Sequence, residues 1–96
     1  MSLVLLSGLD DAIIGLGQRL SDGGHKAFLV YDVNKILDTL VEREGMSSED
    51  AVEFFQFNIQ GAYLGESTPA FMTLMDYETV IEKIDEFQEI IEAESE

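Results

Sequence analysis

Two hydrophobic patterns meet at Asp32, and their order constrains the fold of this chain more than any other feature. Residues 27–31, Ala-Phe-Leu-Val-Tyr, are aliphatic and aromatic without a polar break, which is typical of a buried strand. Directly after Asp32 the apolar residues recur at the spacing of one helical stripe: Val33, Ile36, Leu37, Leu40 and Val41. Aspartate is a favoured helix N-cap, so we expect a strand to end and a helix to begin there. Such a change of period predicts an α+β fold.

A further strand is expected before this one. Residues 21–24, Ser-Asp-Gly-Gly, are a turn signal. Residues 9–20 fit either a helix or a strand, but Gly15 and Gly17 would each cost about 1 kcal/mol in a helix interior. We therefore favour a strand over residues 12–17. With the strand that follows the turn, it would form a hairpin with a long glycine-rich loop.

The rest of the chain predicts two more helices. Gly45 is placed to end the first helix, and Ser47 with Asp50 three residues later resembles a capping box for the second. That second helix has apolar residues on nearly all sides, so we expect it either in the centre of the core or in an oligomer interface. Asp76 is expected to cap the last helix.

We expect these elements to form one domain over residues 1–96, whose last few residues fray. The predicted architecture is α+β, a small antiparallel sheet of about four strands covered by three helices. The sheet strands are predicted at residues 12–17, 27–31, 62–64 and 70–74, with a short buried strand at 2–6, and the helices at 33–44, 48–60 and 77–93. The apolar seam of the last helix would lie across the sheet or against a second copy of the chain.

Composition excludes several classes of protein. With 20 acidic and 5 basic residues the formal net charge is −15, so neither nucleic acid nor an anionic membrane is expected as a direct partner. The lack of cysteine excludes a disulfide scaffold and thiolate sites. A hydrophobic content of 46% argues against disorder. No apolar stretch is long enough for a membrane span, so we expect a cytoplasmic protein.

The negative charge is concentrated near the C-terminus. Residues 76–96 contain nine acids and one base and so carry −8, whereas residues 1–75 carry −7. Like-charged neighbours four residues apart destabilise a helix, so packing of the apolar seam must hold this one in place. The candidate partner-facing strip consists of Glu78, Glu82, Asp85, Glu86 and Glu89. It either recognises a basic partner or only keeps the chain soluble.

An aromatic string, Phe-Phe-Gln-Phe-Asn at residues 54–58, is the second candidate site. Helix periodicity cannot place all three rings on one face. We favour a core role for these residues, and the alternative makes Phe54 and Phe57 interface aromatics that contact another subunit or a partner.

Nothing in the sequence indicates an active site. His25 is the only histidine and has no partner for metal binding or catalysis. A hard cation would require several carboxylates, for which Asp10, Asp11, Asp32 and Asp38 are the candidates, but no calcium-binding loop motif is present. We therefore assign no catalytic residue and no metal site, and expect no cofactor. A small metal-dependent enzyme that uses Asp10, Asp11 or Asp32 ranks last among the functions considered.

A set of short motifs resembles small acidic proteins encoded in bacteriophage and prophage genomes. The motifs lie within about residues 9–74 and are Tyr-Asp at 31–32, Glu-Gly-Met-Ser at 44–47, Glu-Asp-Ala at 49–51, Phe-Gln-Phe-Asn at 55–58, Gly-Ala-Tyr-Leu-Gly at 61–65 and Thr-Pro at 68–69. The resemblance implies a phage setting in a bacterial cytoplasm. It implies no activity, and the acidic C-terminal segment lies outside it.

These observations favour a non-enzymatic protein-interaction module with an acidic surface. Its expected partner is a basic host or phage protein. An alternative is a nucleic-acid mimic that inhibits a DNA-binding protein through the same acids. Homodimerisation is a further expectation, because so small a domain has many large apolar residues.

Overall fold

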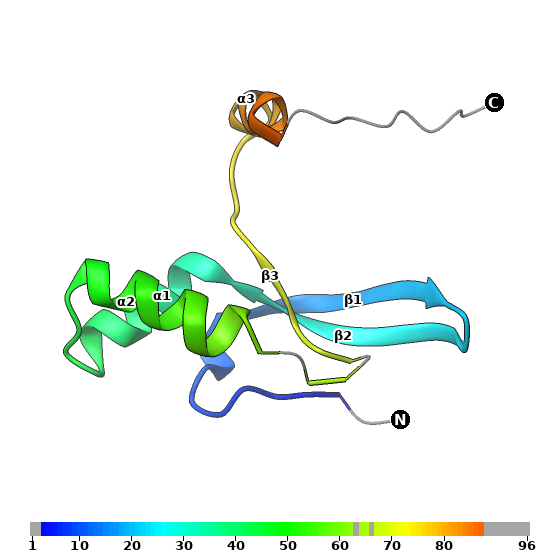
Figure 1. Cartoon of the computed structure of the whole chain (residues 1–96), viewed down its shortest axis with the longest axis horizontal. Coiled ribbons are helices and arrows are strands. Elements are labelled where there is room, and N and C mark those ends of the chain that lie inside the picture. The colour runs from blue at the N-terminus through cyan, green and yellow to red at the C-terminus, as the bar shows by residue number, and fades with distance from the viewer. Residues whose placement is uncertain (1–2, 63, 66, 88–96) are drawn as a thin grey trace.

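The computed structural model describes residues 3–62, 64–65 and 67–87, and the fold in this part is α+β, as predicted. Three strands form one sheet in the order β1 (Ile13–Ser21), β2 (Gly24–Asp32) and β3 (Ala70–Met72). The helices are α1 (Val33–Glu42), α2 (Ser48–Phe54) and α3 (Tyr77–Phe87), with a π-helical segment, η2 (Phe55–Gln60), directly after α2 and a short 3-10 turn, η1 (Asp10–Ala12), before β1. Figure 1 shows α1 and α2 at one end of a long β1–β2 hairpin.

The β1–β2 hairpin confirms the strand prediction for the segment before the turn. Its register pairs Leu16 with Leu29 and Arg19 with Lys26, and it ends at the pair of Ser21 and Gly24. Only two residues therefore form the turn, so the predicted long loop is wrong. Gly24 has a φ of +104°, a conformation that glycine adopts without strain, and this allows the tight connection.

The two helices after the hairpin begin at the predicted capping residues. The Asp32 side chain accepts a hydrogen bond from the Asn34 backbone N–H at 2.9 Å, and the Ser47 hydroxyl accepts one from the Asp50 N–H at 3.1 Å. Gly45, with a φ of +74°, lies in the connection between the two helices, as its predicted C-terminal role requires. The predicted second helix, 48–60, is an α-helix only to Phe54 and is π-helical beyond it.

The hydrophobic core lies between α1, α2 and one face of the sheet. Tyr31 and Ile36 are fully buried, and the Tyr31 ring lies 6.1 Å from that of Phe71. Phe55 meets the same Phe71 ring edge-on at 5.2 Å. The Tyr31 hydroxyl accepts a hydrogen bond from the Leu6 N–H at 2.8 Å, which fastens the N-terminal segment to the core. The other members of the core cluster are Leu9, Ala12, Leu40 and Ala51.

The prediction of a purely antiparallel sheet is wrong, and its fourth strand is not confirmed. The part of the chain that the structure describes contains three strands, and β3 runs parallel to β2, so the sheet is mixed. The connection from β2 to β3 passes through two helices, and such a crossover brings the chain back in the same direction. The predicted strand at 70–74 is shorter, ending at Met72.

Two predicted strands are not found among the described residues. The Ala62 N–H donates to the Ile59 carbonyl and the Leu64 N–H to the Thr68 hydroxyl, so neither N–H pairs with a strand; Tyr63 lies outside the described residues. Residues 3–6 have no strand partner, and Leu3 and Leu5 are exposed rather than buried.

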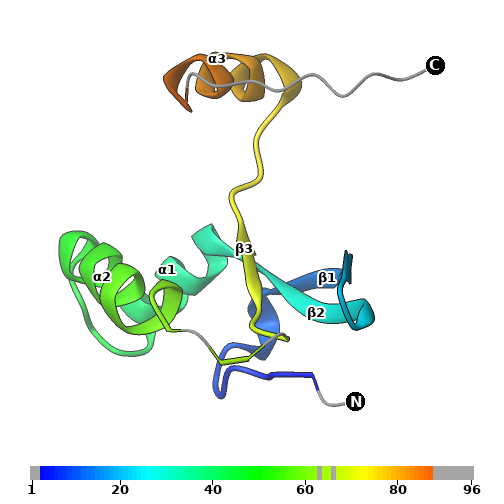
Figure 2. The same ribbon diagram turned by 45° about the vertical axis from the view of Figure 1, so that its right-hand side comes forward.

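Helix α3 lies apart from the rest of the fold. The chain runs from β3 through residues 73–76, and α3 contacts neither the sheet nor α1 and α2 in either view (Figures 1 and 2). It therefore does not lie across its own sheet, one of the two expected arrangements. Residues 88–93 of the predicted helix lie outside the described part. None of the helices described is both long enough and apolar enough to cross a membrane.

Candidate functional site

Helix α3 begins at a well-formed N-cap. The Asp76 side chain accepts a hydrogen bond from the Thr79 backbone N–H at 2.8 Å. The hydrogen bonds that Thr79 donates from its side chain and its backbone hold the pKa of Asp76 below its ordinary value. The predicted cap is therefore present. It stabilises the first turn of a helix that is otherwise rich in like-charged neighbours.

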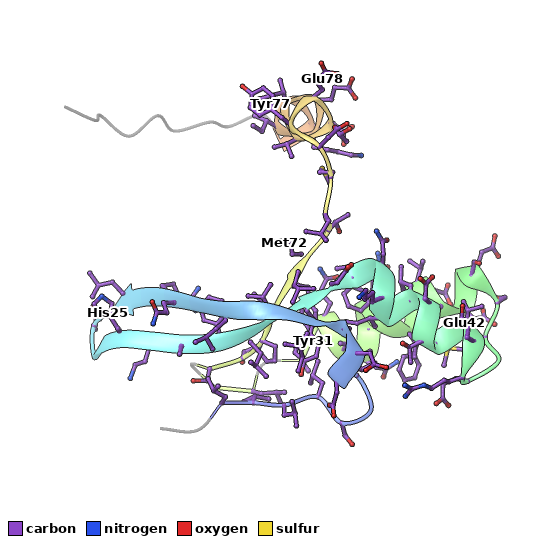
Figure 3. The ribbon with its side chains drawn as sticks, turned by 180° about the vertical axis from the view of Figure 1, so that it is seen from behind. His25, Tyr31, Glu42, Met72, Tyr77 and Glu78 are labelled. Carbon is purple, nitrogen blue, oxygen red and sulfur yellow. The ribbon has the colours of Figure 1, made fainter. Side chains whose placement is uncertain are left out.

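Most of the described apolar side chains of α3 are exposed, and Ile84 is half-buried. We call Tyr77, Val80, Ile81 and Ile84 the apolar seam, because 100° of rotation per residue places them on one side of the helix. Tyr77 is 76% exposed and Ile81 41% exposed. Figure 3 shows Tyr77 and Glu78 on α3, away from the sheet. Packing of this seam was expected to hold the helix in place, and no other part of the described chain supplies that packing.

The acids of α3 lie on another side of the helix. Glu78, Glu82 and Glu86, which we call the acidic face, follow each other at intervals of four residues and are exposed. Glu82 and Glu86 lie roughly opposite the seam by the same 100° rotation. Lys83 forms an ion pair with Glu86 at 3.7 Å, which locally offsets the negative charge. Of the predicted strip, the side chain of Asp85 and the whole of Glu89 lie outside the described part.

The three phenylalanines of residues 54–57 have different environments. Phe55 is 5% exposed and belongs to the core, whereas Phe54 is 38% and Phe57 79% exposed. The core role that we favoured for all three thus holds for Phe55 alone. Phe54 and Phe57 line the same shallow hollow of about 380 Å³, together with Met46, Asp50, Glu53 and Asn58.

A larger apolar pocket, which the sequence did not predict, adjoins this hollow. Its volume is about 570 Å³, and it is bounded by the N-terminal segment, the end of α1 and the π-helical segment. The walls are mostly aliphatic, with Leu6, Leu9, Leu40, Met46, Phe54, Ile59 and Leu64 among them. Arg43 stands at its edge and donates to the Gly8 carbonyl at 3.2 Å, so it joins the N-terminal segment to α1. No sequence signal could have revealed this pocket, because π-helical geometry sets one of its walls.

A third apolar surface is the side of the sheet that faces away from the helices. Side chains alternate along a strand, and residues paired across strands share a face. Tyr31 and Phe71 point into the core, so Phe28 and Val30 of β2, with Ala70 and Met72 of β3, lie on the opposite side, which we call the open sheet face. Gly17 pairs with Phe28 there, and its position leaves room only for that ring. The Arg19 guanidinium lies 5.4 Å from the centre of the Phe28 ring.

The candidate metal-binding aspartates are not brought together. Asp32 caps α1, Asp11 lies 3.5 Å from Arg43, and Asp10 is exposed in η1. Within residues 3–62, 64–65 and 67–87, no three histidine, aspartate or glutamate side chains gather in a way that could hold a metal ion. His25 is exposed at the far end of the hairpin (Figure 3).

Comparison with family models, with curated proteins and with solved structures gave no match to this chain. The resemblance to phage-encoded acidic proteins stays a prediction from the sequence. The function therefore has to be argued from the surfaces described above.

Proposed function

We propose that this chain is a non-enzymatic protein-interaction module whose main contacts are made by α3. One observation carries the proposal: α3 holds an exposed apolar seam and an exposed acidic face away from the rest of the fold. A helix whose apolar side is uncovered in the single chain gains stability from any partner that covers it. Clustered exposed apolar side chains commonly mark such contact surfaces.

The chemistry of the acidic face favours a basic protein as partner. Glu78, Glu82 and Glu86 present carboxylates along one side of α3, and complementary charge speeds association and excludes acidic competitors. A phage setting would place that partner in the host cytoplasm. Phe54 and Phe57 are a second candidate contact, because both side chains border one hollow on the surface.

The test is capture of partners from a bacterial lysate with the full chain immobilised. We expect at least one basic protein to bind at low salt and to be released as ionic strength rises. The variant E78Q/E82Q/E86Q should lose it. The matched control E42Q/E49Q/E53Q removes three exposed acids from α1 and α2 and should retain it.

Equal capture by both variants, or no salt-dependent partner at all, would show that the acids of α3 serve solubility alone. Duplex DNA added as a competitor examines the nucleic-acid-mimic alternative. Displacement of the captured protein by DNA would identify the acidic face as a mimic of the phosphate backbone.

A further inference from the structure

Two apolar surfaces of this chain are uncovered, and packing one against the other would bury both. One is the apolar seam of α3 and the second is the open sheet face. A helix lying across a sheet is the common way for both to be buried in an α+β fold. In both views α3 lies away from the sheet of the same chain, so it does not cover the open sheet face (Figures 1 and 2).

The open sheet face is also flat enough to receive a helix. Gly15 and Gly17 of β1 pair with Val30 and Phe28 on this face. A Cβ at Gly15 would meet no atom within 4 Å, so the surface beside Val30 is open. Met72, at the end of β3, is 46% exposed on the same face. A face with two glycines and mostly medium-sized apolar side chains lets a helix backbone approach closely.

The distribution of charge indicates which of the uncovered surfaces α3 binds. Residues 76–87 contain five acids and one base, so α3 and its cap carry −4. Residues 33–60 form α1, α2 and much of the lining of the shallow hollow and of the larger apolar pocket. They contain six acids and two bases and also carry −4. Residues 13–31 contain Arg19 and Lys26 against Asp22 and carry +1. Electrostatic repulsion thus disfavours binding of α3 over the shallow hollow or the larger apolar pocket, and electrostatic attraction favours its binding on the open sheet face.

We propose that the chain forms a symmetric dimer in which α3 of each copy lies on the open sheet face of the other. The inference rests on the proposed function, and it names a second copy of the chain as the partner of the apolar seam. Arg19 and Lys26 pair with each other across β1 and β2 on that face, where they meet Glu78, the acid of the acidic face that lies nearest the edge of the seam. Each copy gives one helix and receives one, so the assembly closes at two.

Exchange of charge between the two surfaces provides the sharpest test. The variant R19E/K26E makes that end of the sheet acidic, and E78K reverses the charge at the edge of the seam. Either variant alone should dimerise more weakly than the natural chain, whose dimer has twice the 10.7 kDa mass of one copy. An equal mixture of the two variants should regain the doubled mass, because residue 78 of each helix then faces residues 19 and 26 of opposite charge. Sedimentation equilibrium measures all four samples.

A second pair of variants asks whether the open sheet face is the receiving surface. Gly15→Glu adds a charged side chain where the single chain has open space, so the monomer should fold and the dimer should be lost. Gln18→Glu adds the same charge to the same strand, but Gln18 pairs with Ala27 on the other face and the variant should remain dimeric.

The oligomeric state decides the inference, and lysate capture decides the proposed function. A monomeric natural chain would exclude the exchange. A dimer that survives R19E/K26E and Gly15→Glu would place the contact between the α3 helices instead. A monomer that still captures a basic protein would leave the proposed function standing, whereas a dimer that captures nothing would contradict only that function.

Discussion

At the scale of single residues, Gly17 is the position where a missing side chain matters most. The Phe28 ring occupies the space that a Cβ on Gly17 would need, and the Arg19 guanidinium lies 5.4 Å from the centre of the same ring. Glycine here is required by the close approach of a neighbour rather than by backbone conformation. The aromatic ring, the guanidinium and the glycine therefore form one packed unit at the middle of the hairpin.

Gly17→Ala should lower the free energy of unfolding by about 1–3 kcal/mol, since the Phe28 ring has to move away from the new methyl group. Gly15→Ala is the matched control, because a Cβ there meets nothing. It should leave the free energy of unfolding unchanged or raise it by about 0.4–1 kcal/mol, because alanine reduces the conformational entropy of the unfolded chain. Urea unfolding of both variants measures the difference. Equal effects would show that Phe28 does not pack on Gly17.

At the scale of elements, the helix caps follow from local sequence signals, whereas the pairing of β3 does not. The caps at Asp32, Ser47 and Asp76 depend on residues two or three positions away, so the sequence alone predicts them. The parallel pairing of β3 depends on where a two-helix crossover returns the chain, which no local pattern encodes.

The candidate surfaces show the same division. The acidic face follows from helix periodicity, and its residues were predicted. The open sheet face required the orientation of β3, and the position of α3 required its tertiary environment. An apolar seam has the same sequence pattern whether its own sheet or another molecule covers it.

The segment after α2 allows a direct comparison of two neighbouring rings. Phe55→Ala removes a 5%-exposed side chain that packs edge-on against Phe71, and should cost about 3–5 kcal/mol. Phe57→Ala removes a ring that is 79% exposed and should change stability by less than about 0.5 kcal/mol. Denaturant unfolding tests both. Similar losses for the two variants would mean that Phe57 is covered in solution, as expected for an interface aromatic.

Acidification should weaken α3 through its cap. The folded pKa of Asp76 lies below the unfolded value, so the cap stabilises α3 at and above the ordinary aspartate range and is lost as pH falls through the folded pKa. At neutral pH, Asp76→Ala should reduce helix content, whereas Glu82→Ala should raise it by removing like-charged neighbours. Below the folded pKa, the deficit of Asp76→Ala should vanish. Far-UV circular dichroism across the pH range, with the Thr79 amide shift, tests both signs.

At the scale of the whole molecule, the net charge of −15 and the proposed dimer oppose each other. Two such copies repel at long range. The few attractive pairs between Arg19, Lys26 and the acids of α3 cannot offset the repulsion between two net charges of −15. The apolar contact between the seam and the open sheet face must therefore provide most of the binding free energy, while the local charges set the orientation.

This balance gives the dimer and the basic partner opposite responses to salt. The Debye length falls from about 30 Å at 0.01 M to about 10 Å at 0.1 M, which screens repulsion between copies but leaves apolar contacts intact. We expect the dimer to become tighter over this range, so that its dissociation constant falls. We expect the complex of the acidic face with a basic partner to become weaker, so that its dissociation constant rises. Sedimentation equilibrium and binding titrations at matched salt concentrations measure the two. A dimer that dissociates on addition of salt would be held mainly by ion pairs, which contradicts burial of the seam as its source of stability.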